Sequence, residues 1–221
     1  MSNTECDGIA GVAVVIDVIR AFTTAAWAFH KGVDRIVLTD DLADALRLKQ
    51  RFPGSLALKD GRPEPGFDLT NSPAQMRDRD DLAGRTIIQR TTHGTIGAVA
   101  ARGAGALYCA SLVCASATAA AVREHEDRDV WFVVTGEDGK ADEDLAAAQF
   151  IAALIEDPET SPAPFMARVD GSGPATRIRA AADSASGAAH PDDISLCMEA
   201  DRFDFAMRAQ DEDGLLVLRK A

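Results

Sequence analysis

Short apolar runs rich in β-branched residues alternate with alanine-rich stretches along most of the chain. A run of the first kind predicts a buried strand, whereas apolar positions that recur every three or four residues predict a helix. Phe22, Ala25 and Phe29 show the helical period within a segment from about 20 to 31. The predicted strands are 12–17, 35–39, 85–89, 106–109, 130–134 and 215–218. The predicted helices are 20–31, 42–51, 95–102, 115–125 and 142–156, with one or two more after 171.

Strands that alternate with helices indicate an α/β fold. We therefore expect a layered, mainly parallel or mixed sheet with flanking helices, in a single unit over residues 1–221. The proline-rich segment 157–164 is the best candidate for a linker. A subdivision there would give a main layer at 1–156 and a smaller C-terminal part at 165–221.

The charge balance excludes one class of partner. The chain has 221 residues, with 23 Lys and Arg against 35 Asp and Glu, and a formal net charge of −12. Nucleic acid needs a basic surface, so we expect no nucleic-acid partner, although a few arginines in a cleft can still bind a small anion. No apolar run approaches the roughly 18 residues that span a membrane, and no signal-peptide pattern is present, so we expect a cytoplasmic protein without a membrane partner. The four cysteines stand at no metal-ligand spacing, so we expect them to be reduced and mostly buried.

Residues directly after each predicted strand are the first candidates for chemistry, because ligands of open α/β sheets bind beyond the carboxyl ends of the strands. Asp17 ends the first strand, and Arg20 opens the helix that follows. A carboxylate there can hold a hard cation, and an arginine in the next turn can bind an anion. The alternative is that Asp17 only caps the helix and that Arg20 is solvated.

A loop dense in proline and glycine, at 60–73, is a second candidate. Its last three residues, Asn-Ser-Pro, have the pattern of a helix cap followed by proline at the first helical position. Rigid loops that also contain polar side chains, here Arg62, Asp68 and Asn71, often carry binding or catalytic residues. The alternative is a polar connection without a further role.

The segment Arg-Thr-Thr-His-Gly-Thr at 90–95 lies directly between a predicted strand and a predicted helix. Its hydroxyls, its glycine and the free N–H groups of a helix start are suited to hold a phosphate. The segment lacks the lysine of a Walker sequence, so nucleotide binding does not follow. His93 could bind an anion, act as a general acid or hydrogen-bond a loop carbonyl.

The acidic segment 135–144 also follows a strand and precedes a helix. Acids at a helix start usually stabilise the helix dipole, but they are also the ligands that Mg²⁺ needs beside a phosphoryl group. Strand ends that carry anion donors and acids together indicate a metal-assisted site for a phosphorylated ligand.

These segments, in this order, resemble those of the 2-phosphosulfolactate phosphatase (ComB) family, enzymes of coenzyme M biosynthesis. The resemblance covers about residues 12–205, with a looser similarity in the acidic segment 192–201. The matching segments are Val-Val-Ile-Asp-Val-Ile-Arg at 14–20, Gly-Phe-Asp-Leu-Thr-Asn-Ser-Pro at 66–73, Thr-Thr-His-Gly-Thr at 91–95 and Glu-Asp at 143–144.

The resemblance implies a three-layer α/β fold and Mg²⁺-dependent hydrolysis of a phosphate monoester of a small acidic 2-hydroxy acid. It implies that Asp17, Arg20 and Asp68 are catalytic residues, to which we add His93 for its place in the 91–95 segment. The implied substrate- and phosphate-binding residues are Asn71, Ser72, Thr91, Thr92, Gly94 and Thr95, and Arg62 and Arg90 are further candidates for binding the second anionic group of the substrate. The implied metal ligands are Asp17, Glu143 and Asp144. Either a carboxylate attacks the phosphorus to give an acyl phosphate, or water attacks it directly.

Three positions depart from the family's pattern. His93 stands where the family usually has asparagine, Asp60-Gly61-Arg62 stands for a Gly-Glu-Arg triplet, and Cys114 follows Ala-Ser in place of Gly-Ser with a nearby asparagine. Two alternatives to the phosphatase therefore stay open. One is a related enzyme that acts on another phosphorylated compound, and the other is a non-catalytic anion-binding homologue. A homodimer is a further expectation.

Overall fold

The computed structural model describes residues 1–6, 8–125, 128–184 and 186–221. These residues form an α/β fold with one nine-stranded mixed sheet flanked by helices, which confirms the predicted fold class. The strands are β1 (Val12–Ile16), β2 (Arg35–Leu38), β3 (Leu56–Lys59), β4 (Leu69–Thr70), β5 (Thr86–Arg90), β6 (Ala106–Ala110), β7 (Val130–Val134), β8 (Met207–Glu212) and β9 (Leu215–Lys220). The α-helices are α1 (Ala21–His30), α2 (Leu42–Arg51), α3 (Pro73–Arg77), α4 (Gly94–Ala100), α5 (Ala115–Arg123), α6 (Asp142–Glu156), α7 (Ala163–Asp170), α8 (Gly173–Ala182) and α9 (Asp193–Cys197). Short 3₁₀ helices are η1 (Asn3–Glu5), η2 (Leu112–Cys114) and η3 (Glu137–Gly139).

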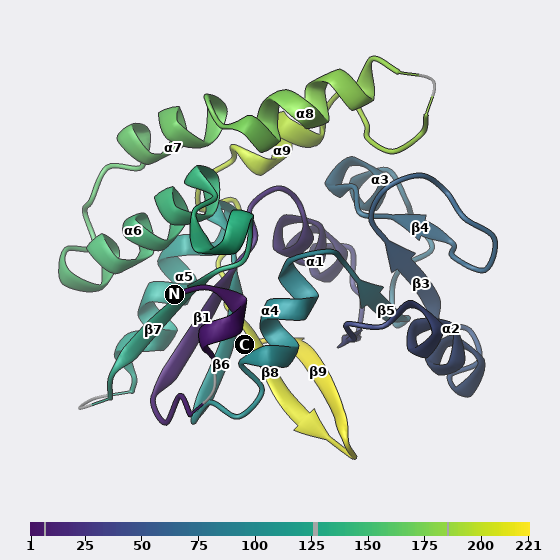
Figure 1. The fold of residues 1–221 in the computed structure, drawn as a ribbon, viewed down its shortest axis with the longest axis horizontal. Helices are drawn as coiled ribbons and strands as arrows, with labels where there is room; N and C mark the ends of the chain where they lie inside the picture. Colours follow the sequence, from purple (N-terminus) through teal and green to yellow (C-terminus); the bar gives the residue numbers. More distant parts are fainter. Residues whose placement is uncertain (7, 126–127, 185) are drawn as a thin grey trace.

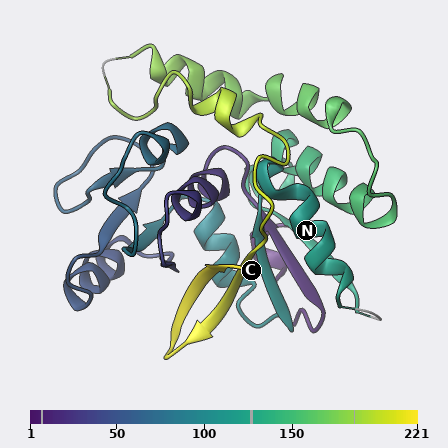
Figure 2. The same cartoon turned by 180° about the vertical axis from the view of Figure 1, so that it is seen from behind.

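The sheet consists of two parallel blocks that an antiparallel hairpin joins. Its strand order is β4-β3-β5-β2-β9-β8-β6-β1-β7. The strands β4, β3, β5 and β2 pair in parallel, as do β6, β1 and β7. The hairpin β8–β9 pairs antiparallel with β6 on one side and with β2 on the other. Figures 1 and 2 show this hairpin in yellow between the two blocks.

The most apolar segments of the sequence form the interior. All five residues of β1 are buried, as expected for a strand with a parallel neighbour on each side and helices over its faces. In α1, residues 21–29 are all buried, so this helix is apolar around its whole circumference. By contrast, α2 buries only Ala45 and Leu48, and the Asp41 side chain caps it by accepting a hydrogen bond from the N–H of Asp44.

Most predicted elements are confirmed, but β3, β4, β8 and α7 were not predicted. β8 has the sequence Met-Arg-Ala-Gln-Asp-Glu, in which only Met207 and Ala209 are buried, so its apolar pattern is too sparse to indicate a strand. The four cysteines are all buried, as predicted, and Cys109, Cys114 and Cys197 are free thiols. None of the helices formed by the described residues combines the length and the apolar character needed to cross a membrane.

The chain after the proline-rich segment 157–164 covers one end of the sheet and then completes it. α7 and α8 run across the top of the molecule in both views (Figures 1 and 2), and α9 packs against α3 and α8. The chain then returns to form β8 and β9 in the middle of the sheet. Residues 165–221 therefore contribute to the same sheet as the preceding part of the chain.

Candidate active site

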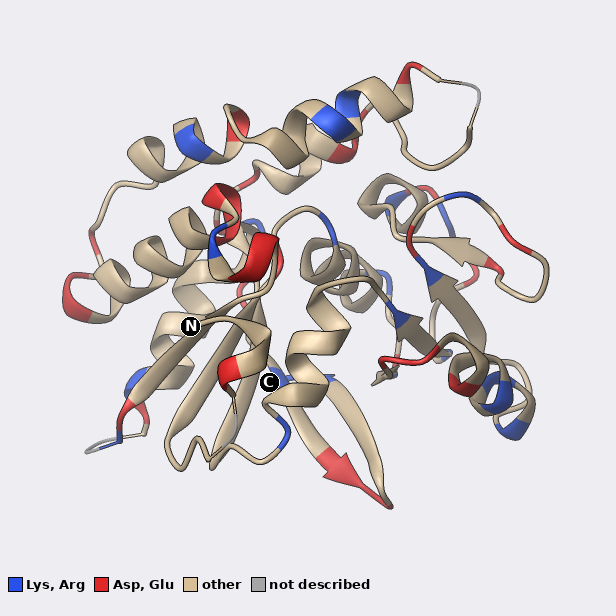
Figure 3. Cartoon of the chain, in the orientation of Figure 1, with Lys and Arg blue, Asp and Glu red and all other residues tan. Residues whose placement is uncertain are grey.

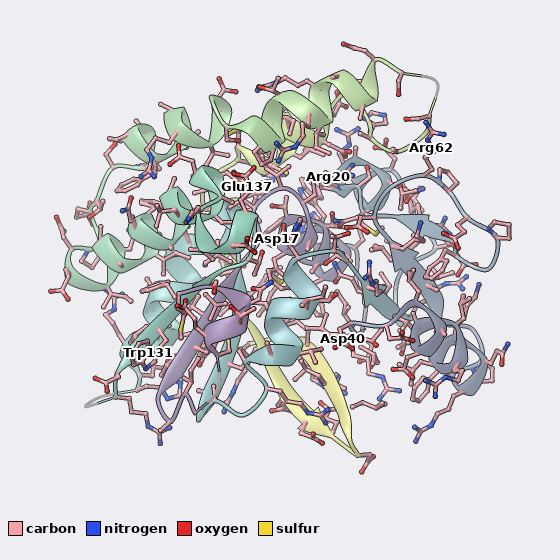
Figure 4. The ribbon with its side chains drawn as sticks, viewed as in Figure 1. Asp17, Arg20, Asp40, Arg62, Trp131 and Glu137 are labelled. Atoms are coloured by element: carbon pink, nitrogen blue, oxygen red, sulfur yellow. The ribbon has the colours of Figure 1, made fainter. Side chains whose placement is uncertain are left out.

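Two adjoining cavities lie where β1, β3, β5 and β7 end, next to α8. Both are lined by Ile19 from the β1–α1 loop and by Ile178 from α8. The cavity that we call acidic has a volume of about 180 Å³, and its charged lining residues and histidine are Asp17, His93, Glu137, Glu143, Asp144 and Arg177. The cavity that we call basic has a volume of about 480 Å³, and its polar lining residues are Arg20, Lys59, Asp60, Glu64, Asn71, Arg90 and Thr92. Figure 4 shows Asp17, Arg20 and Glu137 near one another below α8.

Asp17 lies directly after β1 and lines the acidic cavity although only 6% of its surface is exposed. Its Oδ1 accepts a hydrogen bond of 3.0 Å from the N–H of Ala21, and the N–H of Gly94 also donates to its carboxylate. A Cβ on Gly94 would lie 2.7 Å from Oδ2, so only glycine permits this approach of α4. Burial raises the pKa of Asp17, and the Ala21 N–H opposes that shift. Asp17 therefore caps α1 and faces the cavity at the same time.

Asp144, in the first turn of α6, ties together the loops that follow β1 and β7. Its Oδ1 accepts a hydrogen bond of 2.8 Å from the N–H of Val18. Its Oδ2 accepts hydrogen bonds from the N–H of Gly136 at 3.2 Å and from the hydroxyl of Thr135 at 3.3 Å. Burial raises the pKa of Asp144 well above its usual value, and the carboxylate of Asp17 adds to this effect. The position of this buried carboxylate is thus fixed by backbone donors.

Glu143 is a buried carboxylate whose hydrogen-bonding capacity the described residues satisfy only in part. It is 3% exposed, and its Oε2 has no hydrogen-bond partner among the described residues. Burial raises the pKa of Glu143 to about 7, and the nearby carboxylates of Asp17 and Glu137 contribute to the rise. An unpartnered buried carboxylate oxygen is unfavourable, which points to a cation or a ligand proton donor as its partner.

The chemistry of these three acids fits a hard divalent cation. Mg²⁺ binds carboxylate oxygens, and a positive charge here would offset the burial that raises the pKa of Glu143 and Asp144 and the repulsion between carboxylates that adds to it. The unpartnered Oε2 of Glu143 is one available donor. Within the part of the chain that the structure describes, no three His, Cys, Asp or Glu side chains are already arranged to hold a metal ion. The donor set therefore fits Mg²⁺, whereas the oxygens do not yet form a coordination shell.

The basic cavity lies over the ends of β3 and β5. Lys59 ends β3, and its Nζ is 2.9 Å from Oε2 of Glu64. Arg90 ends β5, and its Nη1 is 4.0 Å from Oδ1 of Asp60. The Oδ1 of Asn71, a residue that lines this cavity and is 4% exposed, has no hydrogen-bond partner among the described residues. With Arg20 as a third cation, basic residues outnumber acidic ones, so this cavity suits an anion.

Arg20 is held by a buried network that the sequence did not reveal. Its Nη1 donates to Oδ2 of Asp193 at 2.5 Å, and its Nη2 donates to the carbonyl oxygen of Ala188 at 3.0 Å. The hydroxyl of Ser72 donates to Oδ1 of the same aspartate at 2.5 Å. Arg20 and Asp193 are 5% and 0% exposed, so a fully buried ion pair joins the β1–α1 loop to α9. Ser72 also caps α3, as predicted, by accepting a hydrogen bond from the N–H of Gln75.

Within the 90–95 segment only some side chains face the cavities. The hydroxyl of Thr95 accepts a hydrogen bond from the N–H of Thr91, and the hydroxyl of Thr91 accepts one from the N–H of Thr95. Both threonines are buried and close the loop on itself. Thr92 lines the basic cavity, and its N–H donates to Asp60. His93 is exposed and lines the acidic cavity.

Asp68 and Arg62 line neither cavity. Asp68 pairs with Lys49 at 2.8 Å and accepts a hydrogen bond from the N–H of Ala57, so it joins α2 to β3. Arg62 is exposed on the β3–β4 loop, far from Asp17 in Figure 4. The structure thus brings together Asp17, Arg20, Asn71, Arg90, Thr92, His93, Gly94, Glu143 and Asp144, and leaves Arg62, Asp68, Ser72, Thr91 and Thr95 outside the two cavities.

Several charged residues at or beside the cavities were missed by the sequence interpretation. Lys59 ends a strand that was not predicted, and Glu137 lies in the predicted acidic segment without having been singled out. Arg177 and Asp193 belong to the C-terminal part, whose helices have no sequence pattern that indicates which side faces the sheet. A prediction of β3 would have identified Lys59, which ends this strand, and the looser similarity of segment 192–201 to the family was a signal for Asp193.

Fold and cavities together define an α/β protein whose candidate site, half acidic and half basic, lies at the carboxyl ends of its strands. The chain belongs to the 2-phosphosulpholactate phosphatase family, whose sequence model matches residues 2–212. This assignment confirms the resemblance found in the sequence.

Several similar proteins bear the name probable 2-phosphosulfolactate phosphatase. One from Bacillus subtilis (strain 168) is 31% identical over 208 residues, which cover 93% of this chain and 89% of the relative. One from Synechococcus sp. (strain RCC307) is 36% identical over 160 residues, which cover 70% of this chain and 65% of the relative. One from Thermoplasma acidophilum is 32% identical over 155 residues, which cover 69% of each. The chain thus matches slightly less than two thirds of the Synechococcus relative's length.

Proposed function

We propose that this protein is a Mg²⁺-dependent phosphatase that hydrolyses the phosphate monoester of a small acidic 2-hydroxy acid, either 2-phosphosulfolactate or a close analogue. The observation that carries this proposal is the pairing of a buried acidic cavity with an adjoining basic one. A substrate with a phosphoryl group at one end and a second anionic group at the other matches that pairing. The names of the relatives support the same substrate class.

Asp17, Glu143 and Asp144 would hold the Mg²⁺ ion. When bound, the ion supplies neutralisation of the charge that develops on the phosphoryl oxygens. Asp17 faces the cavity from the end of β1, so its carboxylate is available either to attack the phosphorus or to orient an attacking water. His93 lines the same cavity and would give a proton to the leaving oxygen.

The basic cavity would bind the second anionic group of the substrate. Arg20, Lys59 and Arg90 supply the positive charge, and the N–H groups of Asn71 can donate hydrogen bonds. Anchoring one end of the substrate fixes the position of the other end, which makes the reaction effectively intramolecular. The basic cavity thereby selects diacidic substrates over simple phosphate esters.

The test is phosphate release from a panel of phosphorylated 2-hydroxy acids and simple monoesters, with and without EDTA. We expect turnover of a diacidic ester that stops in excess chelator and returns on addition of Mg²⁺. Full turnover in excess chelator contradicts the metal requirement. Binding of these esters without release of phosphate from any of them favours the non-catalytic homologue. The homodimer stays a prediction, which light scattering tests.

A further inference from the structure

The acidic cavity carries an imbalance of charge that a phosphate ester would make worse. The carboxylates of Asp17, Glu137, Glu143 and Asp144 line it. Among its lining residues that the structure describes, Arg177 is the only lysine or arginine. A phosphoryl dianion needs cationic donors in direct contact, and arginine provides them in a geometry that matches two phosphate oxygens.

Arg177 is held in place by an acid of the same cavity. Its Nη2 lies 3.2 Å from Oε1 of Glu137, and its side chain is 64% exposed. Gly173, one turn earlier on α8, leaves room for the guanidinium, because a Cβ there would lie 3.2 Å from Nη1. Exposed ion pairs of this kind contribute little to stability. A bound anion can therefore readily displace Glu137.

The helix that carries Arg177 extends over both cavities. Pro174, Arg177 and Ile178 line the acidic cavity, while Ile178 and Ala181 line the basic one. Figure 3 shows basic residues of α8 (blue) above the acidic start of α6 and the loop before it (red). Arg179, two residues later, has a different environment, because it pairs with Asp170 and donates to the Asp170 carbonyl oxygen at 3.0 Å. Only one of these two arginines therefore belongs to the site.

We propose that Arg177 is a phosphate-binding residue that exchanges Glu137 for the phosphoryl oxygens of the substrate. Without a bound anion, the Glu137 carboxylate pairs with the Arg177 guanidinium. Glu137 therefore competes with phosphate for this guanidinium. This assignment deepens the proposed function and rests on it for the identity of the ligand. It adds a cationic contact from α8 to a cavity whose carboxylates come from the loop after β1, from η3 and from α6.

Titration calorimetry with inorganic phosphate tests the exchange without requiring turnover. The full-length protein is compared with Arg177→Ala, Arg177→Lys and the control Arg179→Ala. We expect Arg177→Ala to weaken phosphate binding about 10-fold or more, the usual effect of losing a charged hydrogen bond. Arg177→Lys should lose less, because it keeps the charge but not the paired donors. Arg179→Ala should stay within about 2-fold of the wild type.

A second variant tests the role of Glu137 in the opposite direction. Glu137→Gln removes the competing carboxylate, so we expect phosphate to bind about 3-fold more tightly at low salt. Thermal unfolding of each variant shows whether it folds like the wild type. Equal phosphate affinity in wild type and Arg177→Ala overturns the proposal, as does wild-type protein that binds no phosphate. Unchanged affinity in Glu137→Gln overturns the exchange.

The same proteins separate this inference from the proposed function. If the wild type binds phosphate through Arg177 but hydrolyses no monoester, the binding residue stands and the phosphatase assignment falls. If the wild type hydrolyses a monoester, Arg177→Ala should raise KM about 10-fold or more, with a smaller fall in kcat. Turnover with the same KM in Arg177→Ala and Arg179→Ala overturns the inference and leaves the phosphatase assignment intact.

Discussion

The acidic and basic cavities share a wall but hold their charges by different means. The acidic cavity is built mainly on the ends of β1 and β7. Its carboxylates Asp17, Glu143 and Asp144 are buried, and backbone N–H donors fix those of Asp17 and Asp144. The basic cavity is built on the ends of β3 and β5, and its cations Lys59 and Arg90 are partly exposed beside acidic partners. The two cavities thus differ in how far their charged groups are buried, in how firmly hydrogen bonds hold these groups, and in whether opposite charges pair with them.

The difference in burial and charge pairing indicates that the two cavities have different roles in the reaction. Buried charges of one sign raise the energy of the empty acidic cavity, so it gains most from a cation and from charge that changes during reaction. Partly exposed, paired cations cost little to maintain and bind an incoming anion by exchanging partners. We therefore expect changes to the buried carboxylates of the acidic cavity to alter kcat and changes in the basic cavity to alter KM.

Arg20 is the buried cation of the basic cavity, and its loss of support should give the largest effect. Asp193→Ala leaves the Arg20 guanidinium buried without its carboxylate partner, so we expect the free energy of unfolding to fall by about 3–5 kcal/mol. Chemical denaturation measures this change. The control is Asp192→Ala, which removes only a half-exposed pair with Arg77 and should change stability by less than about 1 kcal/mol. Similar stabilities for the two variants would show that the buried Arg20–Asp193 pair contributes no more to stability than the half-exposed Arg77–Asp192 pair.

Asp17→Asn tests the acidic cavity directly. The amide can still accept the hydrogen bond from Ala21 but loses the negative charge, so we expect kcat to fall at least about 100-fold, or roughly 2.7 kcal/mol, with little change in KM. Phosphate release measures the rate. Asp40→Asn is the matched control, because Asp40 lies beyond the end of β2, is exposed and lines neither cavity (Figure 4). Near wild-type turnover in Asp17→Asn would reduce Asp17 to a helix cap.

Glu143 predicts how the stability of the metal-free protein depends on pH. Its pKa is about 7 in the folded protein and 4.5 as an ordinary glutamate, so the folded state binds the proton more tightly. The stability that the protonated form contributes is complete below about pH 4.5 and is lost as pH rises through 7. In excess chelator, we expect Glu143→Gln to remove this loss and to be more stable than wild type at pH 8 by on the order of 2 kcal/mol. Thermal unfolding across pH measures the effect.

The control for that experiment is the adjacent, half-exposed Asp142, which pairs with Arg168. Asp142→Asn should keep the wild-type dependence on pH. If Glu143→Gln also keeps the wild-type dependence of stability on pH, then burial and the neighbouring carboxylates do not raise the pKa of Glu143 to about 7.

Lys59→Ala tests the basic cavity and should have the smallest effect. We expect KM for a diacidic substrate to rise about 10-fold, the loss of one charged contact, while kcat changes little. KM for a simple monoester should stay unchanged, because that substrate leaves the basic cavity empty. Lys49→Ala, which breaks the Lys49–Asp68 pair outside both cavities, is the control. A fall in kcat without a rise in KM would contradict the assignment of the basic cavity to substrate binding.

Sequence patterns predicted the fold where burial is complete. β1 and α1 were found because every position of β1 and nearly every position of α1 is apolar or small. β8 was missed because its exposed face carries Arg208, Gln210 and other polar residues between two buried positions. Its partner β6 lies far earlier in the chain, while β9 follows it directly in the hairpin, so pairing decides its structure more than local composition does.

The candidate site was predicted where strand ends could be recognised. Asp17 and Arg90 each end or follow a predicted strand, and both line a cavity. Asp68 was included as part of a motif, but its contacts with Lys49 and the N–H of Ala57 are local. Arg177 reaches the acidic cavity only because α8 lies over the strand ends that form it, and no local sequence pattern predicts this arrangement.

The hairpin β8–β9 has a consequence for how the protein is synthesised. Residues 207–220 follow all the other strands in the chain, yet they lie between the two parallel blocks. Until they leave the ribosome, β2 and β6 each present an unpaired edge, and nothing in the sheet holds one block to the other. Because the acidic cavity rests mainly on one block and the basic cavity on the other, the two cavities come to lie on one continuous sheet only after this late pairing.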